Sequence, residues 1–364
     1  MPKADKSETT YLRGARSFLA GRFETVAREP FDDGWTPDEK DERPLETQVT
    51  IERARSILSH NDSPDVGFST SINPYRGCEH GCVYCYARPS HAYLELSPGL
   101  DFETKNFAKT NAAELLRAEL GKPGYQPSPI ALGANTDCYQ PEERKYRITR
   151  QILEVLAEAE HPVTLVTKSA LVERDLDILK VMAEKNLVRV FVSIGTLDRE
   201  LARKLEPRAA SPQRRLDVLK KLKESQVPCG VMVAALIPAL NDKTLEHVLE
   251  AAAAAGAEQA AYVILRLPNE LKDLFKEWLA AHYPERAEHV VSIVRQMRGG
   301  RDNDPRFGTR MSGLGNFAEL IGKRFDIACR KYGLNQPGPA ARRGELDCSR
   351  FRPPARNPGQ MVLF

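Results

Sequence analysis

The residues Asn73-Pro74-Tyr75-Arg76-Gly77-Cys78-Glu79-His80-Gly81-Cys82-Val83-Tyr84-Cys85-Tyr86-Ala87-Arg88 place three cysteines in the spacing C-x3-C-x2-C. A zinc site with four protein ligands needs a second pair of Cys or His residues, and no C-x2-C or H-x3-5-H pattern follows in the chain. Cysteine thiolates are also the usual ligands of iron–sulfur clusters, and three thiolates on a four-iron cluster leave one iron open to a ligand from outside the protein. Gly77 and Gly81 suit a loop around such a bulky group, because glycine adopts positive φ angles readily. The spacing therefore indicates an iron–sulfur cluster, with a structural metal site or buried free thiols as the alternatives.

With the aromatic residue Tyr84 just before the third cysteine, the motif resembles the signature of the radical S-adenosylmethionine (SAM) superfamily. The resemblance implies a 4Fe-4S cluster on Cys78, Cys82 and Cys85, whose open iron binds SAM and whose reduction cleaves SAM to a 5′-deoxyadenosyl radical. It also implies that the cofactor supplies the chemistry while the protein orients the reactants. Much of the chain, from residue 63 to residue 334, more narrowly resembles bacterial radical SAM proteins related to spore photoproduct lyase, many of which are uncharacterised.

The composition is typical of a globular protein, with 41% hydrophobic and 28% charged residues among 364. That length suits one large α/β domain with extensions, or two domains. No apolar run approaches the ~20 residues of a membrane span, and the first residues lack the apolar core of a signal peptide. The seven cysteines, three of them clustered, do not form the pattern of a disulfide framework. We therefore expect a cytoplasmic protein with no membrane segment.

Apolar strand candidates alternate with helical stretches through the middle of the chain. Strands are expected at residues 68–75, 130–135, 163–167, 188–194, 230–236 and 260–265, and helices at residues 112–120, 143–159, 171–185, 211–225, 244–255, 269–281, 285–297 and 317–332. Such alternation implies an α/β fold with parallel strands and crossover helices. Six strands match the partial (β/α)6 TIM-like barrel that the resemblance implies, although the pattern alone leaves a doubly wound open sheet as an alternative.

Four regions are expected along the chain. Residues 1–62 are charged and interrupted by prolines, so they predict a flexible N-terminal arm with a short helix at residues 51–58. Residues 63–297 are expected to form the radical SAM partial barrel, residues 298–334 a helical C-terminal extension, and residues 335–364 a disordered tail rich in Pro, Gly and Arg.

The C-terminal part of the chain is basic, although the net charge of the whole chain is only +3. Residues 295–356 contain fourteen Lys or Arg against six Asp or Glu. Two interpretations follow, a surface that meets phosphate backbones or a solvated basic tail.

In a parallel barrel, functional side chains gather at the carboxyl ends of the strands. The resemblance implies that Lys168 faces the SAM carboxylate there, that Ser193 lies near SAM, and that Thr136 lies in the region holding its amino group. Tyr84 is expected to pack beside the adenine. Arg208 is a candidate for a carboxylate or phosphate contact, with a surface ion pair as its alternative.

Cys138 is a candidate hydrogen donor. Relatives in the photoproduct-lyase branch carry a cysteine in the loop after the second barrel strand that returns a hydrogen atom to the substrate radical. Here that position is held by Asn135, and Cys138 follows a few residues later. The resemblance therefore does not extend in full to reversal of a photoproduct.

The last five residues, Gln360-Met361-Val362-Leu363-Phe364, resemble the bacterial sliding-clamp-binding motif Gln-Leu-Ser/Asp-Leu-Phe. Met361 for Leu is a near-isosteric exchange, whereas Val362 departs from the motif. The resemblance implies a sliding clamp as a partner; the alternative is a tail that packs on its own domain.

These observations together predict a radical SAM enzyme, lyase-like or transferase-like, that acts on DNA or another nucleic acid in repair or modification. Flavodoxin or ferredoxin is the expected kind of electron donor. One alternative is a radical SAM maturase that modifies a peptide or protein, for which further cysteine clusters would be favourable. The other is a non-catalytic iron–sulfur binding module, which would need no SAM pocket.

Overall fold

The computed structural model describes residues 13–24, 45–336 and 345–355 of the chain. Its main sheet has seven strands in the order β10-β9-β8-β7-β6-β3-β2. Their bounds are β2 Leu58–His60, β3 Thr70–Ile72, β6 Ile130–Leu132, β7 Val163–Thr167, β8 Val188–Ser193, β9 Cys229–Leu236 and β10 Gln259–Ile264. Only β2 runs antiparallel to its neighbour, and every other adjacent pair is parallel.

The six parallel strands stand in the order in which they occur in the chain. A doubly wound sheet reverses its strand order at a switch point, and no such reversal occurs here. Within the described residues the two edge strands, β10 and β2, do not pair with each other, so the sheet is an open partial barrel. The predicted α/β class and the six parallel strands are confirmed, and the doubly wound alternative is excluded.

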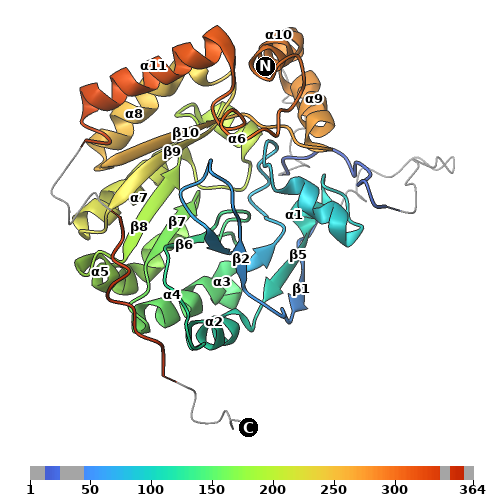
Figure 1. The fold of residues 1–364 in the computed structure, drawn as a ribbon. Coiled ribbons are helices and arrows are strands. Elements are labelled where there is room, and N and C mark those ends of the chain that lie inside the picture. The colour runs from blue at the N-terminus through green and yellow to red at the C-terminus, as the bar shows by residue number, and fades with distance from the viewer. Residues whose placement is uncertain (1–12, 25–44, 337–344, 356–364) are drawn as a thin grey trace, which may run out of the picture.

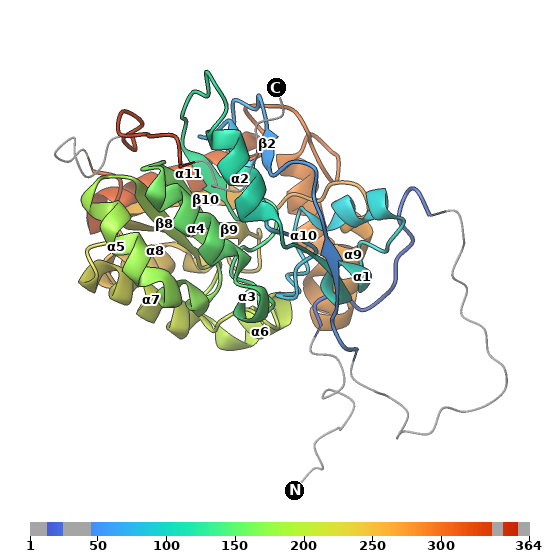
Figure 2. The same ribbon diagram turned by 90° about the horizontal axis from the view of Figure 1, so that it is seen from below.

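Helices cover the outer side of this sheet (Figures 1 and 2). They are α2 Ala112–Leu120, α3 Glu143–Tyr146, α4 Ile148–Glu158, α5 Leu176–Glu184, α6 Arg199–Leu205, α7 Pro212–Glu224 and α8 Leu245–Ala254. Helix α11 (Gly315–Tyr332) packs on α8, and α9 (Leu271–His282) packs against α10 (Pro284–Met297) beside the short α1 (Asp101–Thr104). Among the described residues, no helix combines the length and the apolar character that a membrane span needs.

Several predicted elements differ from the structure. The helix expected at residues 51–58 is wrong, because residues Gln48–Glu52 form strand β1, which pairs in parallel with β5 (Lys105–Lys109). The helix expected at residues 143–159 is split into α3 and α4 by Arg147, whose φ is 53°. Helix α6, which Asp198 caps by accepting from two backbone amides, was not predicted.

Two described parts of the region expected to be a flexible arm, residues 13–24 and 48–52, contact the rest of the protein. Residues 13–24 contact the body of the protein through hydrogen bonds to Glu103, Glu270 and Glu277. Residues 48–52 lie in strand β1. Charge and prolines suggested disorder there, but carboxylates elsewhere in the chain supply partners that composition does not reveal. The boundaries of the four regions stay a prediction.

Part of the tail expected to be disordered also packs on the domain. We call residues 345–355 the C-terminal strap. Its backbone pairs with Asn186 and Ala159, and its Phe351 ring lies 5.3 Å from the ring of Tyr125. These contacts lie at the amino ends of β7 and β8, and the strap runs down past α4 and α5 in Figure 1. The terminal pentapeptide lies outside the described residues.

Candidate functional site

The three motif cysteines lie in a loop between β4 (Tyr75–Arg76) and the 3-10 helix Arg88–Leu94. The loop turns at Gly77 and Gly81, whose φ angles are 76° and 69°. Cys78 and Cys82 are buried and Cys85 is half-buried, and all three are free thiols. The expectation that glycine shapes this loop is therefore met.

The thiols lie close enough to influence one another. Burial raises the pKa of Cys78, and Asp137, Cys82 and Cys85 raise it further. Burial likewise raises the pKa of Cys82 to about 12. Within the described residues, no group of three or more Cys, His, Asp or Glu side chains is arranged to hold a single metal ion. A four-iron cluster does not need such a group, because each cysteine binds a separate iron.

Lys168 follows β7 and is brought to the same end of the sheet as the cysteine loop. Its backbone amide donates to Oδ2 of Asp137 at 2.7 Å, and its Nζ lies 5.8 Å from the ring centroid of Tyr84. Burial opposes the charge of Lys168, but Cys82 and Glu206 outweigh it and hold its pKa above the ordinary value. No carboxylate of the described residues lies within ion-pair distance of Nζ, so the ammonium group is available to an added anion.

A buried network that the sequence did not reveal fixes the orientation of Tyr84. The Tyr84 hydroxyl and the Arg215 guanidinium both donate to the carboxylate of Glu206. Arg215 also donates to the backbone carbonyl of Ser193 at 2.9 Å. Burial would raise the pKa of Glu206, but Arg215 and Lys168 lower it, so the carboxylate stays ionised. The network links the cysteine loop to the ends of β8 and β9.

Ser193 lies at the end of β8 and its hydroxyl donates to the carbonyl of Ala234 at 3.3 Å. Thr136, which follows β6, is buried and its hydroxyl donates to the carbonyl of Tyr75 at 2.9 Å. The structure thus brings Ser193 into the group that contains Tyr84 and Lys168. Thr136 instead holds strand β4 in place through its side chain.

Arg208 and Cys138 occupy other surroundings. Arg208 forms an ion pair with Glu79 inside the cysteine loop, and its backbone amide donates to the carbonyl of His80 at 3.3 Å. Of the two interpretations of Arg208, the ion pair is the one that the structure contains. Cys138 has no exposed surface and lies in the main hydrophobic core, where burial raises the pKa of its thiol.

The cysteine loop rests on the N-terminal segment, a contact that sequence reasoning missed. The buried carboxylate of Glu103 accepts from the backbone amides of Gly14 at 2.9 Å and Ala15 at 2.7 Å. The same carboxylate pairs with the fully buried Arg88. A Cβ on Gly14 would lie 1.6 Å from the carbonyl oxygen of Gly81, so only glycine fits there. The glycine at position 14 is the one trace of this contact in the sequence, and it does not identify Gly81 and Glu103 as the partners.

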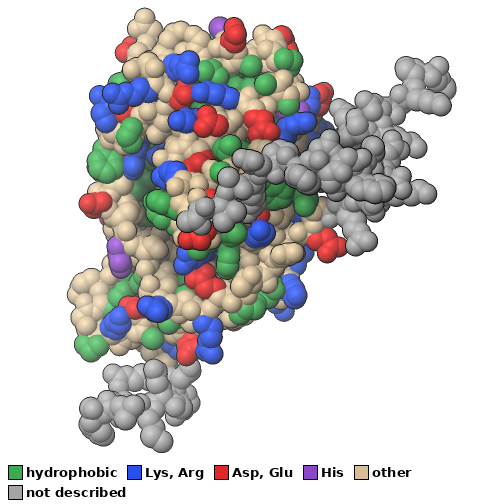
Figure 3. Space-filling model, turned by 90° about the vertical axis from the view of Figure 1, so that its right-hand side faces the viewer, with side chains coloured by type: hydrophobic (Ala, Val, Ile, Leu, Met, Phe, Trp, Pro, Cys, Tyr) green, Lys and Arg blue, Asp and Glu red, His purple; other side chains and the backbone are tan. Residues whose placement is uncertain are grey.

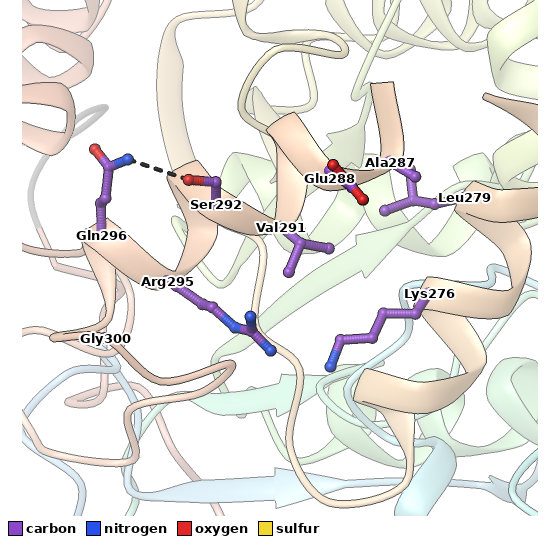
Figure 4. A pocket seen from close by; sticks show the side chains of 9 residues that line it. All are labelled: Lys276, Leu279, Ala287, Glu288, Val291, Ser292, Arg295, Gln296 and Gly300. Carbon is purple, nitrogen blue, oxygen red and sulfur yellow. Dashed lines mark hydrogen bonds between the residues drawn. The ribbon is translucent and has the colours of Figure 1, made fainter. Parts of the chain in front are cut away.

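A cavity of about 840 Å³ lies between α9 and α10 (Figure 4). None of the predicted site residues lines it. Its two cations, Lys276 and Arg295, point toward one another and each forms an ion pair with Asp302 at 2.7 Å. The neighbouring face of the molecule mixes Lys and Arg with Asp and Glu side chains (Figure 3). Neither feature indicates a ligand, so the cysteine loop remains the candidate site.

The chain is similar to known proteins in sequence. The family model of the radical SAM superfamily matches residues 72–252. An uncharacterized protein of Mycobacterium tuberculosis is 38% identical over 231 residues, which are 63% of this chain and 68% of that protein. An uncharacterized protein of Methanocaldococcus jannaschii is 26% identical over 247 residues, which are 68% of this chain and 88% of that protein.

The fold is similar to solved structures of one enzyme. A mutant of spore photoproduct lyase aligns with a TM-score of 0.58 and 16% identity over 79% of this chain and 80% of that one. Spore photoproduct lyase complexed with dinucleoside spore photoproduct aligns with a TM-score of 0.58 and 15% identity over the same shares. At this level of identity the likeness shows the fold.

Proposed function

Because the chain belongs to the radical SAM superfamily, we propose that it holds a 4Fe-4S cluster on Cys78, Cys82 and Cys85 and cleaves SAM reductively to start radical chemistry on a nucleic acid. The observation that carries this proposal is the meeting of three free thiols in one loop with the unpaired ammonium group of Lys168. When bound, the reduced cluster supplies the electron that cleaves SAM, and the cleaved SAM removes a hydrogen atom from the substrate.

The residues around the loop suit the binding of SAM. Lys168 offers a cation to the carboxylate of SAM, and a charge-assisted hydrogen bond of this kind is among the strong ones. Tyr84 offers an aromatic face, and Glu206 fixes its ring by accepting from its hydroxyl. Ser193 offers a hydroxyl at the end of β8. All of these residues lie within residues 63–297, the region predicted as the radical SAM barrel.

A nucleic-acid substrate is supported by two observations. The fold resembles spore photoproduct lyase, which has been solved in complex with dinucleoside spore photoproduct. The chain is also basic over residues 295–356. We leave Cys138 out of the proposed site, because its thiol is enclosed in the core. The four cysteines outside the motif are scattered in the sequence, so no second cysteine cluster supports the peptide-modifying alternative.

The test is cluster assembly and SAM cleavage by the full-length protein under anaerobic conditions. After reconstitution with iron and sulfide, the wild-type protein should bind about four iron atoms per chain. With dithionite and SAM it should then release 5′-deoxyadenosine. Replacement of any motif cysteine by Ala should abolish both signals, whereas Cys348→Ala, a matched control in the strap, should keep them. Retention of iron and cleavage by all three motif variants would contradict the proposal.

We propose two protein partners that fit a cytoplasmic enzyme of this kind. Flavodoxin or ferredoxin would supply the electron. A sliding clamp would bind the terminal residues Gln360, Met361, Val362, Leu363 and Phe364, whose support is the motif in the sequence. A pull-down with purified clamp, comparing the intact protein with one that lacks residues 360–364, tests this second partner. Equal recovery of clamp by both proteins would remove it from the proposal.

A further inference from the structure

Arg266 follows strand β10 and forms no ion pair with any carboxylate in the part of the chain that the structure describes. Its Nε is buried without a hydrogen-bond partner, and its Nη1 contacts only the Sδ of Met311, at 3.7 Å. No carboxylate of the described residues lies within ion-pair distance of it. Arg266 is half-buried rather than enclosed, so the open part of its guanidinium can meet an added anion without first breaking an ion pair.

Two further arginines lie beside Arg266. Arg298 is buried and donates to the carbonyls of Leu265 and Arg310, both at 2.8 Å, which ties the loop at residues 299–314 to the end of β10. Arg310 pairs with Asp65 at 2.5 Å. Asp304, which pairs with Arg306, is the other carboxylate that acts on this group. Of the three arginines, Arg310 alone forms an ion pair within the described residues, so the positive charges outnumber the negative ones here.

Two exposed aromatic rings flank these cations. Tyr86 is 47% exposed and its ring centroid lies 5.7 Å from the Arg266 guanidinium. Phe307 is 55% exposed and its ring centroid lies 4.6 Å from the guanidinium of Arg310. Exposed rings beside arginines are the kind of stacking platform that single-stranded nucleic-acid sites use.

This group of residues adjoins the cysteine loop. Tyr86 directly follows the third motif cysteine, and its hydroxyl donates to the carbonyl of Ala134, just beyond β6. The Arg266 guanidinium lies over the ring of this tyrosine, 5.7 Å from its centroid. Tyr86 therefore joins the cysteine loop to Arg266, and a ligand on Arg266 would be held beside that loop.

We propose that Tyr86, Arg266, Phe307 and Arg310 form a binding surface for a nucleic-acid strand, in which Arg266 receives a phosphate group and Phe307 stacks on an unpaired base. The inference rests on the proposed function, since it names the phosphate group and the base of the substrate that this chain binds. A guanidinium fork matches the geometry of a phosphate, and every base has a face that stacks on an aromatic ring. An acidic peptide would use the cations but would leave both rings without a role.

The experiment uses the full-length protein and a short fluorescent single-stranded oligodeoxynucleotide, with binding followed by fluorescence anisotropy over a range of salt concentrations. Arg266→Ala should weaken binding about tenfold and lower the slope of log affinity against log salt by about one. Phe307→Ala should weaken binding about tenfold with an unchanged slope, because a stacked base carries no charge. Arg286→Ala, which removes an exposed arginine from α10, should bind as the wild-type protein does.

The outcomes separate this inference from the proposed function. Unchanged affinity and slope in Arg266→Ala, equal losses in Arg286→Ala, or equal competition by an acidic peptide of the same charge would overturn it. Failure of the wild-type protein to bind the oligodeoxynucleotide would do the same. If Arg266→Ala shows no thermal unfolding transition, Phe307→Ala decides, since its ring is exposed and its loss leaves the core intact. The oligodeoxynucleotide assay needs no SAM, so failure to cleave SAM would overturn the enzyme proposal alone.

Discussion

The two ends of the parallel sheet are built in different ways. At the carboxyl ends of the strands lie buried thiols, the ionised Glu206 and the cations Lys168 and Arg266, neither of which pairs with a carboxylate of the described residues. At the amino ends the C-terminal strap packs on the sheet through backbone hydrogen bonds and through the contact of the Phe351 ring with His161. Charges there pair with one another near the surface, as Arg117 does with Glu158 at 2.5 Å.

The difference shows at which end of the sheet charged side chains lack a partner within the described residues. Parallel α/β enzymes carry their functional groups at the carboxyl ends of the strands, while the amino ends serve stability. Here the strap donates backbone hydrogen bonds to Asn186 and Ala159 at the amino ends. At the carboxyl ends, Lys168 and Arg266 have no carboxylate partner among the described residues. Substitutions at the two ends should therefore differ in the size of their effect on stability or in whether they change ligand binding, and the following predictions test that difference.

The largest effect on stability is expected from Glu103→Ala beside the cysteine loop. It leaves Arg88 buried without its partner and removes the acceptor of two backbone amides, which should cost about 3–5 kcal/mol of unfolding free energy. The matched change at the other end, Glu158→Ala, breaks a half-exposed ion pair with Arg117 and should cost less than about 1 kcal/mol. Urea denaturation of both variants measures the difference, and equal midpoints would contradict it.

A smaller effect, confined to ligand binding, is expected from Lys168→Ala. The variant should keep its iron and bind SAM more weakly by about 1.5–3 kcal/mol, the scale of a hydrogen bond to a charged group. Lys185→Ala at the amino ends removes a cation that pairs with Glu160 and should leave SAM affinity unchanged. Calorimetric titration with SAM measures both, and an unchanged affinity in Lys168→Ala would show that another group meets the carboxylate.

Phe351→Ala in the strap should act on stability alone. Its ring contacts Tyr125 and His161, and loss of this aromatic packing should cost about 2 kcal/mol. SAM affinity and iron content should equal those of the wild-type protein. A fall in either would mean that the two ends of the sheet are coupled.

The smallest effect is a pH dependence at the amino ends. Burial lowers the pKa of His161 to about 4, whereas an unfolded chain has a histidine pKa of about 6.5. The stabilisation is therefore full above about pH 6.5 and is lost as the pH falls toward 4, because the unfolded state takes up the proton first. Between pH 7 and 5.5 this group should cost about 1 kcal/mol of unfolding free energy. His161→Gln should flatten that part of the pH profile in urea denaturation.

The sequence predicted the features that depend on short spacings. Alternating apolar and helical stretches predicted all six parallel strands, and the motif placed Tyr84 in a group with Lys168 and Ser193 once the strand ends were aligned. Pairings across long separations escaped it. Glu206 bonds to Tyr84 across 122 positions and Glu103 to Gly14 across 89, and neither pair carries a local pattern.

The errors have the same origin. Residues 48–52 form a strand because β5, more than fifty positions later, offers an edge to pair with. The strap is ordered because Asn186 and Ala159 offer backbone partners to a segment that has no core of its own. Composition reports what a segment can do alone, and both segments gain their structure from distant parts of the chain.

The contact between the N-terminal segment and Glu103 bears on how the protein is produced for study. A trimmed version that begins at residue 45, the start of the second described segment, would discard Arg13, Gly14 and Ala15. The buried carboxylate would then lose both amides, and Gly81 beside the cysteines would lose the backbone that packs against it. Trimming after the strap, at residue 356, removes no described contact. If the version that begins at residue 45 fails to take up iron, the cause would be the loss of this contact and not the lack of a cluster site in the full-length protein.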